Sequence, residues 1–248
     1  MTLPFDLSLT AAAYMAVVLF GAAFVRGYSG FGFSALTVTG AALATNPLHF
    51  VGVVLMLEFL ITFQQWNGVW RDVDWRRVAA LMVGSSVGVP LGLWAITQIP
   101  PDAARAVIAV YVLGMCAVLM RGWVLTRPQT LPAHAVVGGV AGLANAVGMG
   151  GLPVATYFTA QALGSRVFRA TLIAYFALLD GLTVPLMWWH GLITADTLIA
   201  MLAALPVVAG GVWLGGRHFL NTDPQDFRRF AIVLLAVLAM LGLVKAVM

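Results

Sequence analysis

Two glycine-rich segments break the apolar stretches of this 248-residue chain, one in each half. The first extends from Arg26 to Gly32 and the second from Asn145 to Gly151. A helix broken at membrane depth persists only where protein or an aqueous cavity surrounds it. Each break also provides a helix N-terminus, whose N–H groups and partial positive charge attract anions. Because breaks in matching positions of two halves are typical of a transporter's binding site, the segments predict a site for a small anion.

The residues expected to contact this anion combine backbone donors at glycines with hydroxyl, amide and guanidinium groups. They are Arg26, Tyr28, Ser29, Gly30, Gly32 and Ser34 at the first break, Asn145, Gly148, Gly150 and Gly151 at the second, and Arg169 beyond it. Glycine permits both the turn and the close approach of a ligand to the backbone. Arg26 has an alternative role in capping carbonyl groups or reaching the membrane surface, and Arg169 has one in orienting the chain.

Glycine also serves a second purpose in lipid, which is the close packing of helices along faces of small residues. We expect this role for the glycines inside uninterrupted spans, namely Gly84, Gly88, Gly92, Gly211 and Gly215. The glycines of the two breaks interrupt helices instead, so a binding role is favoured there over packing alone.

Two carboxylates, Glu58 and Asp180, stand near the middle of apolar segments and are 122 positions apart. An ionisable group inside a membrane is a functional hypothesis by default, and carboxylates there often relay protons. We therefore expect Glu58, Asp180 or both to couple anion movement to protons. The alternative is that each carboxyl group is hydrogen-bonded and braces the backbone of a broken segment.

The other reactive residue types lack the spacing of a metal or catalytic site. The four histidines are scattered, Cys116 is the single cysteine, and no HExxH, nucleophile elbow or CxxC motif occurs. We therefore predict no metal, no cofactor and no enzymatic activity. A membrane-embedded enzyme or a subunit of a larger assembly remains as a competing class.

The composition is that of an integral membrane protein. Hydrophobic residues make up 62% of the chain and charged residues 9%, with a mean hydropathy of +0.98, whereas soluble domains carry roughly 25% charge. No polar stretch is long enough for a second domain, so residues 1–248 are predicted to form a single membrane domain. The net charge of +4 is spread between the apolar segments, which indicates orientation in the bilayer and argues against nucleic-acid binding.

Each half contains a broken segment followed by three single spans. The expected elements are broken segments at about 7–45 and 133–163, spans near 50–66, 78–97 and 104–120 in the first half, and spans near 170–189, 197–215 and 230–247 in the second. About 20 helical residues cross roughly 30 Å of hydrocarbon, and most arms of the broken segments are shorter than that. We therefore interpret each broken segment as a hairpin, of which only the arm before Arg26 is long enough to cross fully.

Local echoes between the halves indicate a duplication with inversion. Trp66-Asn67-Gly68-Val69 is echoed 123 positions later by Trp189-His190-Gly191-Leu192. With hairpins in both halves, ten of the thirteen basic residues fall on one side, and the positive-inside rule then puts both termini outside. Those ten are Arg71, Arg76, Arg77, Arg121, Arg127, Arg166, Arg169, Arg217, Arg228 and Arg229.

The resulting prediction is an all-α polytopic membrane protein with two inverted-topology repeats, residues 1–125 and 126–248. Each repeat is a broken-helix hairpin followed by three transmembrane helices. The two hairpins then enter from opposite faces, so that their tips can meet near the midplane of the bilayer.

The glycine-rich breaks, the Pro47-Leu48-His49-Phe50 that follows the first, and the Gly148-Met149-Gly150-Gly151-Leu152-Pro153 of the second resemble the TauE/SafE family of sulfite exporters, also called TSUP transporters. The resemblance implies a secondary active transporter of a small organosulfur anion, such as sulfite, a sulfonate or sulfoacetate, in a bacterial cytoplasmic membrane. It also implies a homodimer. The alternatives are a passive anion channel and a carrier for a small carboxylate without sulfur.

Overall fold

The computed structural model describes residues 3–66, 69–121, 125, 129–161 and 163–219, which are all-helical apart from short connections. The described elements are the short turns η1 (Pro4–Asp6) and η2 (Trp70–Asp72), and the helices α1 (Leu9–Ser29), α2 (Phe33–Ala44), α3 (Pro47–Trp66), α4 (Trp75–Ile96), α5 (Pro101–Met120), α6 (Leu131–Asn145), α7 (Gly151–Thr159), α8 (Ser165–Trp189) and α9 (Ala195–Phe219). Each predicted segment up to residue 215 coincides with a helix or a helix pair. The last predicted span, near 230–247, lies outside the described residues.

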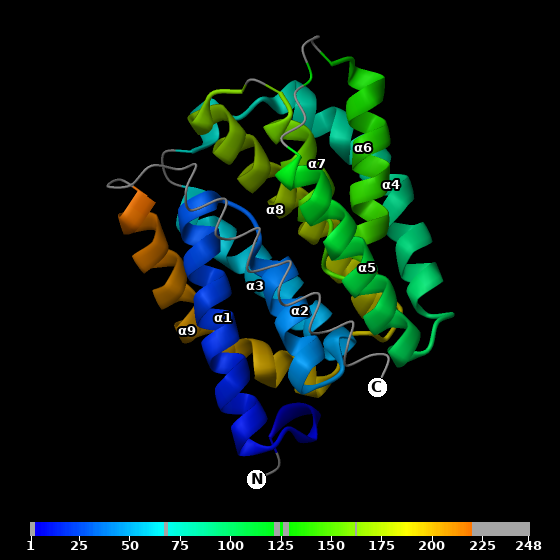
Figure 1. The fold of residues 1–248 in the computed structure, drawn as a ribbon, viewed down its shortest axis with the longest axis vertical. Coiled ribbons are helices and arrows are strands. Elements are labelled where there is room, and N and C mark those ends of the chain that lie inside the picture. Colours follow the sequence, from blue (N-terminus) through cyan, green and yellow to red (C-terminus); the bar gives the residue numbers. More distant parts are fainter. Residues whose placement is uncertain (1–2, 67–68, 122–124, 126–128, 162, 220–248) are drawn as a thin grey trace.

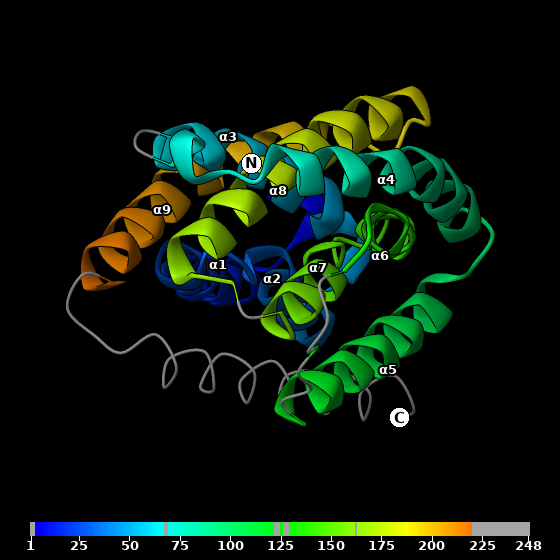
Figure 2. The ribbon, with the colours of Figure 1, turned by 90° about the horizontal axis from the view of Figure 1, so that it is seen from above.

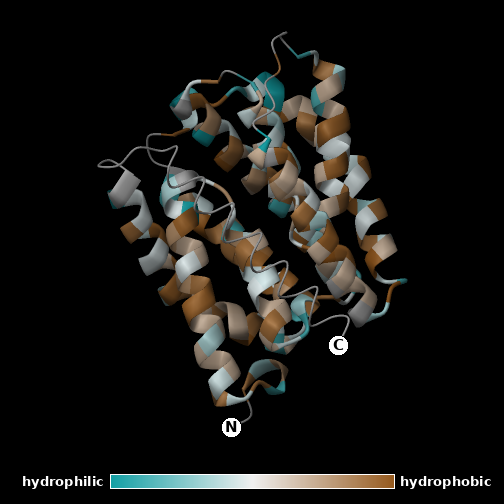
Figure 3. Cartoon of the chain, in the orientation of Figure 1, coloured by the Kyte–Doolittle hydropathy of each residue, from teal (hydrophilic) through white to brown (hydrophobic). Residues whose placement is uncertain are grey.

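Five of the described helices are long and apolar enough to cross a membrane, namely α1, α3, α4, α8 and α9. Their outer faces carry exposed apolar side chains, such as Val83, Val87 and Leu91 on α4 and Leu202 on α9. Figure 3 shows apolar residues along the lengths of the helices and hydrophilic ones gathered mostly towards the two ends. An apolar surface of this extent suits a bilayer, so the protein is a multi-pass membrane protein.

Both predicted breaks are present as turns between two helices. Gly30 and Gly32, with φ of 81° and 93°, separate α1 from α2, and Gly148, with φ of 72°, lies between α6 and α7. Such φ values favour glycine because it lacks a Cβ. At 12 and 9 residues, α2 and α7 reach only about 18 and 14 Å at 1.5 Å per residue. Neither is long enough to cross, as predicted.

The first broken segment folds back on itself as an antiparallel hairpin. The Tyr14 hydroxyl, near the start of α1, donates a hydrogen bond to the carbonyl oxygen of Gly40 at 3.2 Å, near the end of α2. Gly40 also packs directly against Val18. The predicted hairpin is therefore confirmed for α1 and α2, and α1, with 21 residues, is the arm that is long enough to cross.

Helices α3 and α8 pack against each other, with α9 beside α3 and α4 beside α8 (Figures 1 and 2). In each of these two spans 61% of the residues are buried, against 28 to 33% in the spans of α1, α4 and α9. Helix α1 packs along α9 on one side, and α4 packs along α6 on the other, with α5 at that outer edge (Figure 2). Polar groups carried by α3 and α8 are thus shielded from lipid.

Glycines mediate both of these close helix pairs, as predicted for the uninterrupted spans. A Cβ at Gly84 or Gly88 of α4 would collide with the carbonyl oxygen of Ala135 or Gly139 on α6. A Cβ at Gly215 of α9 would likewise collide with the carbonyl oxygen of Phe24 on α1. Small residues allow this approach where lipid provides no hydrophobic drive for helix association.

We predict that Gly84→Ala lowers the free energy of unfolding by about 2 kcal/mol or more, because overpacking at a backbone contact forces the helices apart. Thermal unfolding of the purified protein in detergent measures this effect. Gly210→Ala is the matched control, since Gly210 lies within α9 and a Cβ there meets nothing within 4 Å. Equal stability of the two variants would contradict the packing role.

Candidate functional site

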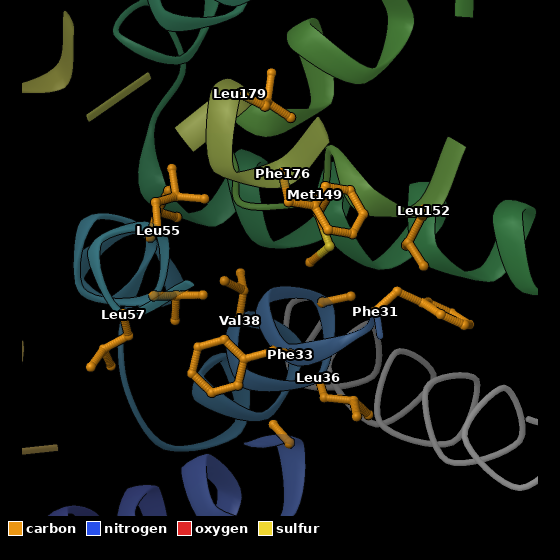
Figure 4. Packing of buried hydrophobic residues seen from close by; sticks show 14 of the residues in the cluster. Phe31, Phe33, Leu36, Val38, Leu55, Leu57, Met149, Leu152, Phe176 and Leu179 are labelled. Carbon is orange, nitrogen blue, oxygen red and sulfur yellow. The ribbon is translucent and has the colours of Figure 1, made fainter. Parts of the chain in front are cut away.

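The two breaks approach each other beside the central helices. A Cβ at Gly148, in the second break, would lie 3.1 Å from Val38 and 4.0 Å from the Cβ of Ser34, both on α2. In Figure 4, Met149 and Phe176 face Val38 of α2 from the side of α7 and α8. The structure therefore brings together residues of the two halves that the sequence singled out separately.

The first break is held by a buried ion pair. Arg26, in the last turn of α1, donates from Nη1 to Oε1 of Glu58 in the middle of α3 at 2.6 Å. The two residues are 0% and 4% exposed, so the pair is closed off from solvent. The Ser34 side chain, in the first turn of α2, also lies close to the Glu58 carboxylate. Both arms of the hairpin thus meet the same carboxylate.

The second break is held by a polar pair in the corresponding place. Asn145, the last residue of α6, donates from Nδ2 to Oδ1 of Asp180 at 3.3 Å and to the hydroxyl oxygen of Thr183 at 2.9 Å. Asn145 and Asp180 are 2% and 1% exposed. In each half, therefore, a side chain at the end of the first arm bonds a carboxylate in the middle of the next long helix.

The two carboxylates lie near each other across the contact between α3 and α8. Gly181, the neighbour of Asp180, packs against the ring of Phe59, the neighbour of Glu58. A Cβ at Gly181 would lie 3.3 Å from this ring. Asp180 also lies within electrostatic range of both Glu58 and Arg26. The charges of this cluster are therefore coupled.

Some polar atoms of the cluster have no hydrogen-bond partner within the described part of the chain. They are Nε and Nη2 of Arg26 and Oδ2 of Asp180. A buried polar atom without a partner costs about 1 to 3 kcal/mol, and more when the group is charged. Unpaired donors on a buried cation make this cluster the best candidate for an anion site.

An aromatic ring connects the cation to the second break. The Cζ atom of Arg26 lies 5.1 Å from the ring centroid of Phe176 on α8, within the range of a cation–π interaction. The far end of the same ring would lie 3.2 Å from a Cβ on Gly151, the first residue of α7. Phe176 thus contacts both the guanidinium group and the N-terminus of α7.

Arg169 contacts the first break from α8. Its Nη2 donates to the carbonyl oxygen of Gly27 at 3.0 Å, and a Cβ at Gly30 would lie 2.9 Å from its Cγ. Basic side chains commonly bond the last carbonyl groups of a helix in this way. Arg169 therefore caps the end of α1 and brings a second positive charge to the cluster.

The other predicted residues line the two turns. Tyr28 is buried in the last turn of α1, and Gly32 precedes the first residue of α2. Gly150 has no room for a side chain, since a Cβ there would lie 2.7 Å from Oδ1 of Asn145. The side chain of Ser29 lies outside the described residues.

Sequence reasoning did not identify Phe176 and Thr183, which contact the cluster, or Tyr175, which joins α8 to α4 beside it. The Tyr175 hydroxyl group on α8 lies 2.8 Å from the Ser85 hydroxyl oxygen on α4, and Ser85 also bonds the carbonyl oxygen of Gly138 on α6. Thr183 follows Asp180 by three positions, a helical spacing that was available as a signal. Nothing in the sequence distinguishes Phe176 from other apolar residues of its span.

Broken helices that meet at buried charges inside a multi-pass bundle define a membrane transporter rather than an enzyme. Residues 14–241 match the sulfite exporter TauE/SafE family. The chain belongs to this family.

Two curated relatives agree with this assignment. The probable inner membrane transporter protein TsaS of Comamonas testosteroni is 25% identical over 193 residues, covering 74% of this chain and 78% of the relative. The probable sulfite/organosulfonate exporter TauE of Cupriavidus necator is 26% identical over 210 residues, covering 82% and 81%. No solved structure matches the chain.

We predict that Glu58→Gln lowers the free energy of unfolding by about 3 kcal/mol, because it leaves the buried Arg26 charge without a counter-ion. The double variant Arg26→Gln with Glu58→Gln should recover much of this loss, since it removes both charges. Thermal unfolding of the wild type, both single variants and the double variant gives the coupling energy. Strictly additive effects would show that the two side chains do not stabilise each other.

Proposed function

We propose that this protein is a secondary active transporter that moves a small organosulfur anion across the bacterial cytoplasmic membrane by alternating access. The observation that carries the proposal is the buried guanidinium group of Arg26 in the first break, two nitrogens of which have no hydrogen-bond partner among the described residues. A sulfite, sulfonate or sulfoacetate ion supplies the oxygen acceptors that these donors lack. One relative is named a sulfite/organosulfonate exporter, which supports this substrate class.

The proposed cycle uses two inverted repeats, residues 1–125 and 126–248. Helix pairing supports this division, because the contact of α1 with α9 has its counterpart in the contact of α6 with α4. The same holds for the pairs α3 with α9 and α8 with α4. The sequence spacing agrees as well. Glu58 and Asp180 are 122 positions apart, and so are Asp74 and Asp196. In this arrangement both termini lie outside.

The two ends of the molecule differ in a way that supports alternating access. At one end the backbone N–H of Asp74 donates to the hydroxyl oxygen of Thr171 at 3.1 Å, joining the start of α4 to α8. At the other end the residues 122 positions away, Asp196 and His49, instead line a pocket of about 680 Å³. We propose that this pocket is the entrance on the N-terminal face and that the opposite end is closed.

Proton coupling is the second part of the proposal and rests on Asp180. Its Oδ2 has no hydrogen-bond partner in the described chain, so it offers a place for a proton. A proton there removes a negative charge close to Arg26 and Glu58, and so reduces repulsion of an arriving anion. Glu58, which is paired with Arg26, is the alternative residue that takes up the proton.

We predict that Asp180→Asn abolishes the pH dependence of transport while leaving the fold intact, because an amide keeps the shape but cannot exchange this proton. Uptake of a labelled sulfonate into proteoliposomes, measured across a range of pH with and without a proton gradient, tests this. Asp74→Asn is the matched control, because Asp74 caps the start of α4 away from the cluster, and its bond to Thr171 uses the backbone N–H, which the change keeps. If Asp180→Asn and Glu58→Gln both retain the wild-type pH dependence, proton coupling through these residues is wrong.

A passive anion channel is the competing function, since it would use the same backbone donors. Proteoliposomes distinguish the two, because a carrier driven by protons concentrates its anion against a gradient and a channel cannot. We expect accumulation of the sulfonate above its external concentration when a proton gradient is imposed. Equilibration without accumulation would establish the channel.

We predict that organosulfur anions raise the midpoint of thermal unfolding of the purified protein more than carboxylates do. A ligand at 100 times its dissociation constant stabilises the folded state by about 2.7 kcal/mol. Sulfite, thiosulfate, sulfonates and small carboxylates form the test panel. Stabilisation by carboxylates alone would replace the proposed substrate class with a carboxylate carrier.

A further inference from the structure

We propose that Arg26 binds the anion through the edge of its guanidinium group that carries Nε and Nη2. These two nitrogens, called the fork below, donate to two oxygens of the anion, and a third oxygen faces the start of α7. The inference rests on the proposed function and adds the geometry of the substrate. It assigns the site to an anion with three oxygens on one tetrahedral sulfur, of the form R–SO₃⁻, in preference to a carboxylate.

The choice of edge follows from which nitrogens of Arg26 are used. A guanidinium group is planar and presents its donors in a fixed geometry. Nη1 donates to Glu58, whereas Nε and Nη2 have no partner in the described chain. Nε and Nη2 lie side by side on the same edge, and their N–H bonds point in the same direction. This is the edge that binds two oxygens of one oxyanion in parallel.

Burial makes the open edge a site. Arg26 is 0% exposed, so its two unpaired nitrogens have no access to bulk water. Leaving charged donors unsatisfied is costly, and an oxyanion on this edge would satisfy both at once. Lysine could supply the charge but not the two parallel donors.

Two contacts keep the edge in place. Glu58 holds one end of the guanidinium group at 2.6 Å, and the ring of Phe176 lies over it, with 5.1 Å between Cζ and the ring centroid. With one nitrogen anchored and one face covered, the plane of the group cannot turn freely. Glu58 and Phe176 are therefore positioning residues for the fork.

The third oxygen is assigned from the second contact of Phe176. The end of this ring packs against Gly151, where α7 begins, so an anion beside Arg26 lies near the N-terminus of α7. Helix N-termini bind the oxygens of anions through backbone N–H groups. Both oxygens of a carboxylate would accept hydrogen bonds from the fork, whereas a sulfonate has a third oxygen that can accept from the N–H groups of α7.

The test compares methanesulfonate with acetate, which differ in the number of oxygens and share the methyl group. Isothermal titration of the purified full-length protein gives the dissociation constant of each, for the wild type and for Arg26→Lys. We expect the wild type to bind methanesulfonate at least about tenfold more tightly than acetate. Arg26→Lys should weaken methanesulfonate binding by roughly tenfold to a hundredfold, the range expected for lost charge-assisted hydrogen bonds.

Arg217→Lys is the matched control. Arg217 also lies over an aromatic ring, at 3.9 Å from the centroid of Trp213, but it is exposed at the end of α9. This variant should bind methanesulfonate as the wild type does. The unfolding midpoint of each variant without ligand checks the fold.

The possible outcomes separate the two proposals. If the wild type binds neither methanesulfonate, sulfite nor acetate, the proposed function is wrong. If it binds methanesulfonate and Arg26→Lys binds it within twofold, the fork is wrong and the function stands. If Arg26→Lys does not fold, the wild type alone still tests the proposal. Acetate binding as tight as methanesulfonate binding would overturn the preference for an anion with three oxygens.

Discussion

The buried ion pair between Arg26 and Glu58 is the interaction on which the centre of this molecule depends. An unpaired charge inside a membrane-spanning protein costs several kcal/mol, so a guanidinium group at this depth requires a counter-ion. The pair holds the end of α1 against the middle of α3, next to the point where the first helix breaks. Asn145 and Asp180 make the corresponding contact between α6 and α8 with a neutral amide in place of the cation.

This constraint explains the arrangement of the helices around it. Charged and amide groups are kept from lipid because α3 and α8, which carry the carboxylates, are enclosed by the other helices. Enclosure requires the neighbouring helices to pack closely, and the glycines of α4, α6 and α9 allow backbone to meet backbone. Gly30, Gly32 and Gly148 of the breaks serve a different purpose, since their positive φ values permit the turns. Gly27, also in the first break, packs instead, because a Cβ there would collide with the carbonyl oxygen of Val212 on α9.

The two halves differ in charge at the place where a substrate would meet them. Within the part of the chain that the structure describes, the first half presents a cation with two nitrogens that have no hydrogen-bond partner, and the second presents an amide and a carboxylate oxygen without one. A symmetrical pair of cations would suit a dianion or two ions. One open guanidinium edge and one site for a proton suit the transport that we propose, of a single anion coupled to a proton.

The sequence by itself determined the class of the protein, the positions of the helices and the two breaks. These features depend on local properties: hydropathy over about 20 residues sets a span, and glycine clusters set the turns. Local sequence also predicted the short second arms, the carboxylates in the middle of spans and the family resemblance. The packing role of Gly84, Gly88 and Gly215 and the turning role of Gly30, Gly32 and Gly148 also followed from whether the surrounding apolar run was interrupted.

Only the tertiary structure decided which residues meet. Arg26 is 32 positions from Glu58, Asn145 is 35 from Asp180, and Arg169 is 142 from Gly27. Nothing local to any of these residues specifies its partner, because the partner depends on how the helices turn and cross. The same is true of Phe176, an ordinary apolar residue in its own span that contacts Arg26 at one break and Gly151 at the other. Helix packing brings these side chains together, and their direction about the helix axis decides which nitrogens of the cation remain open.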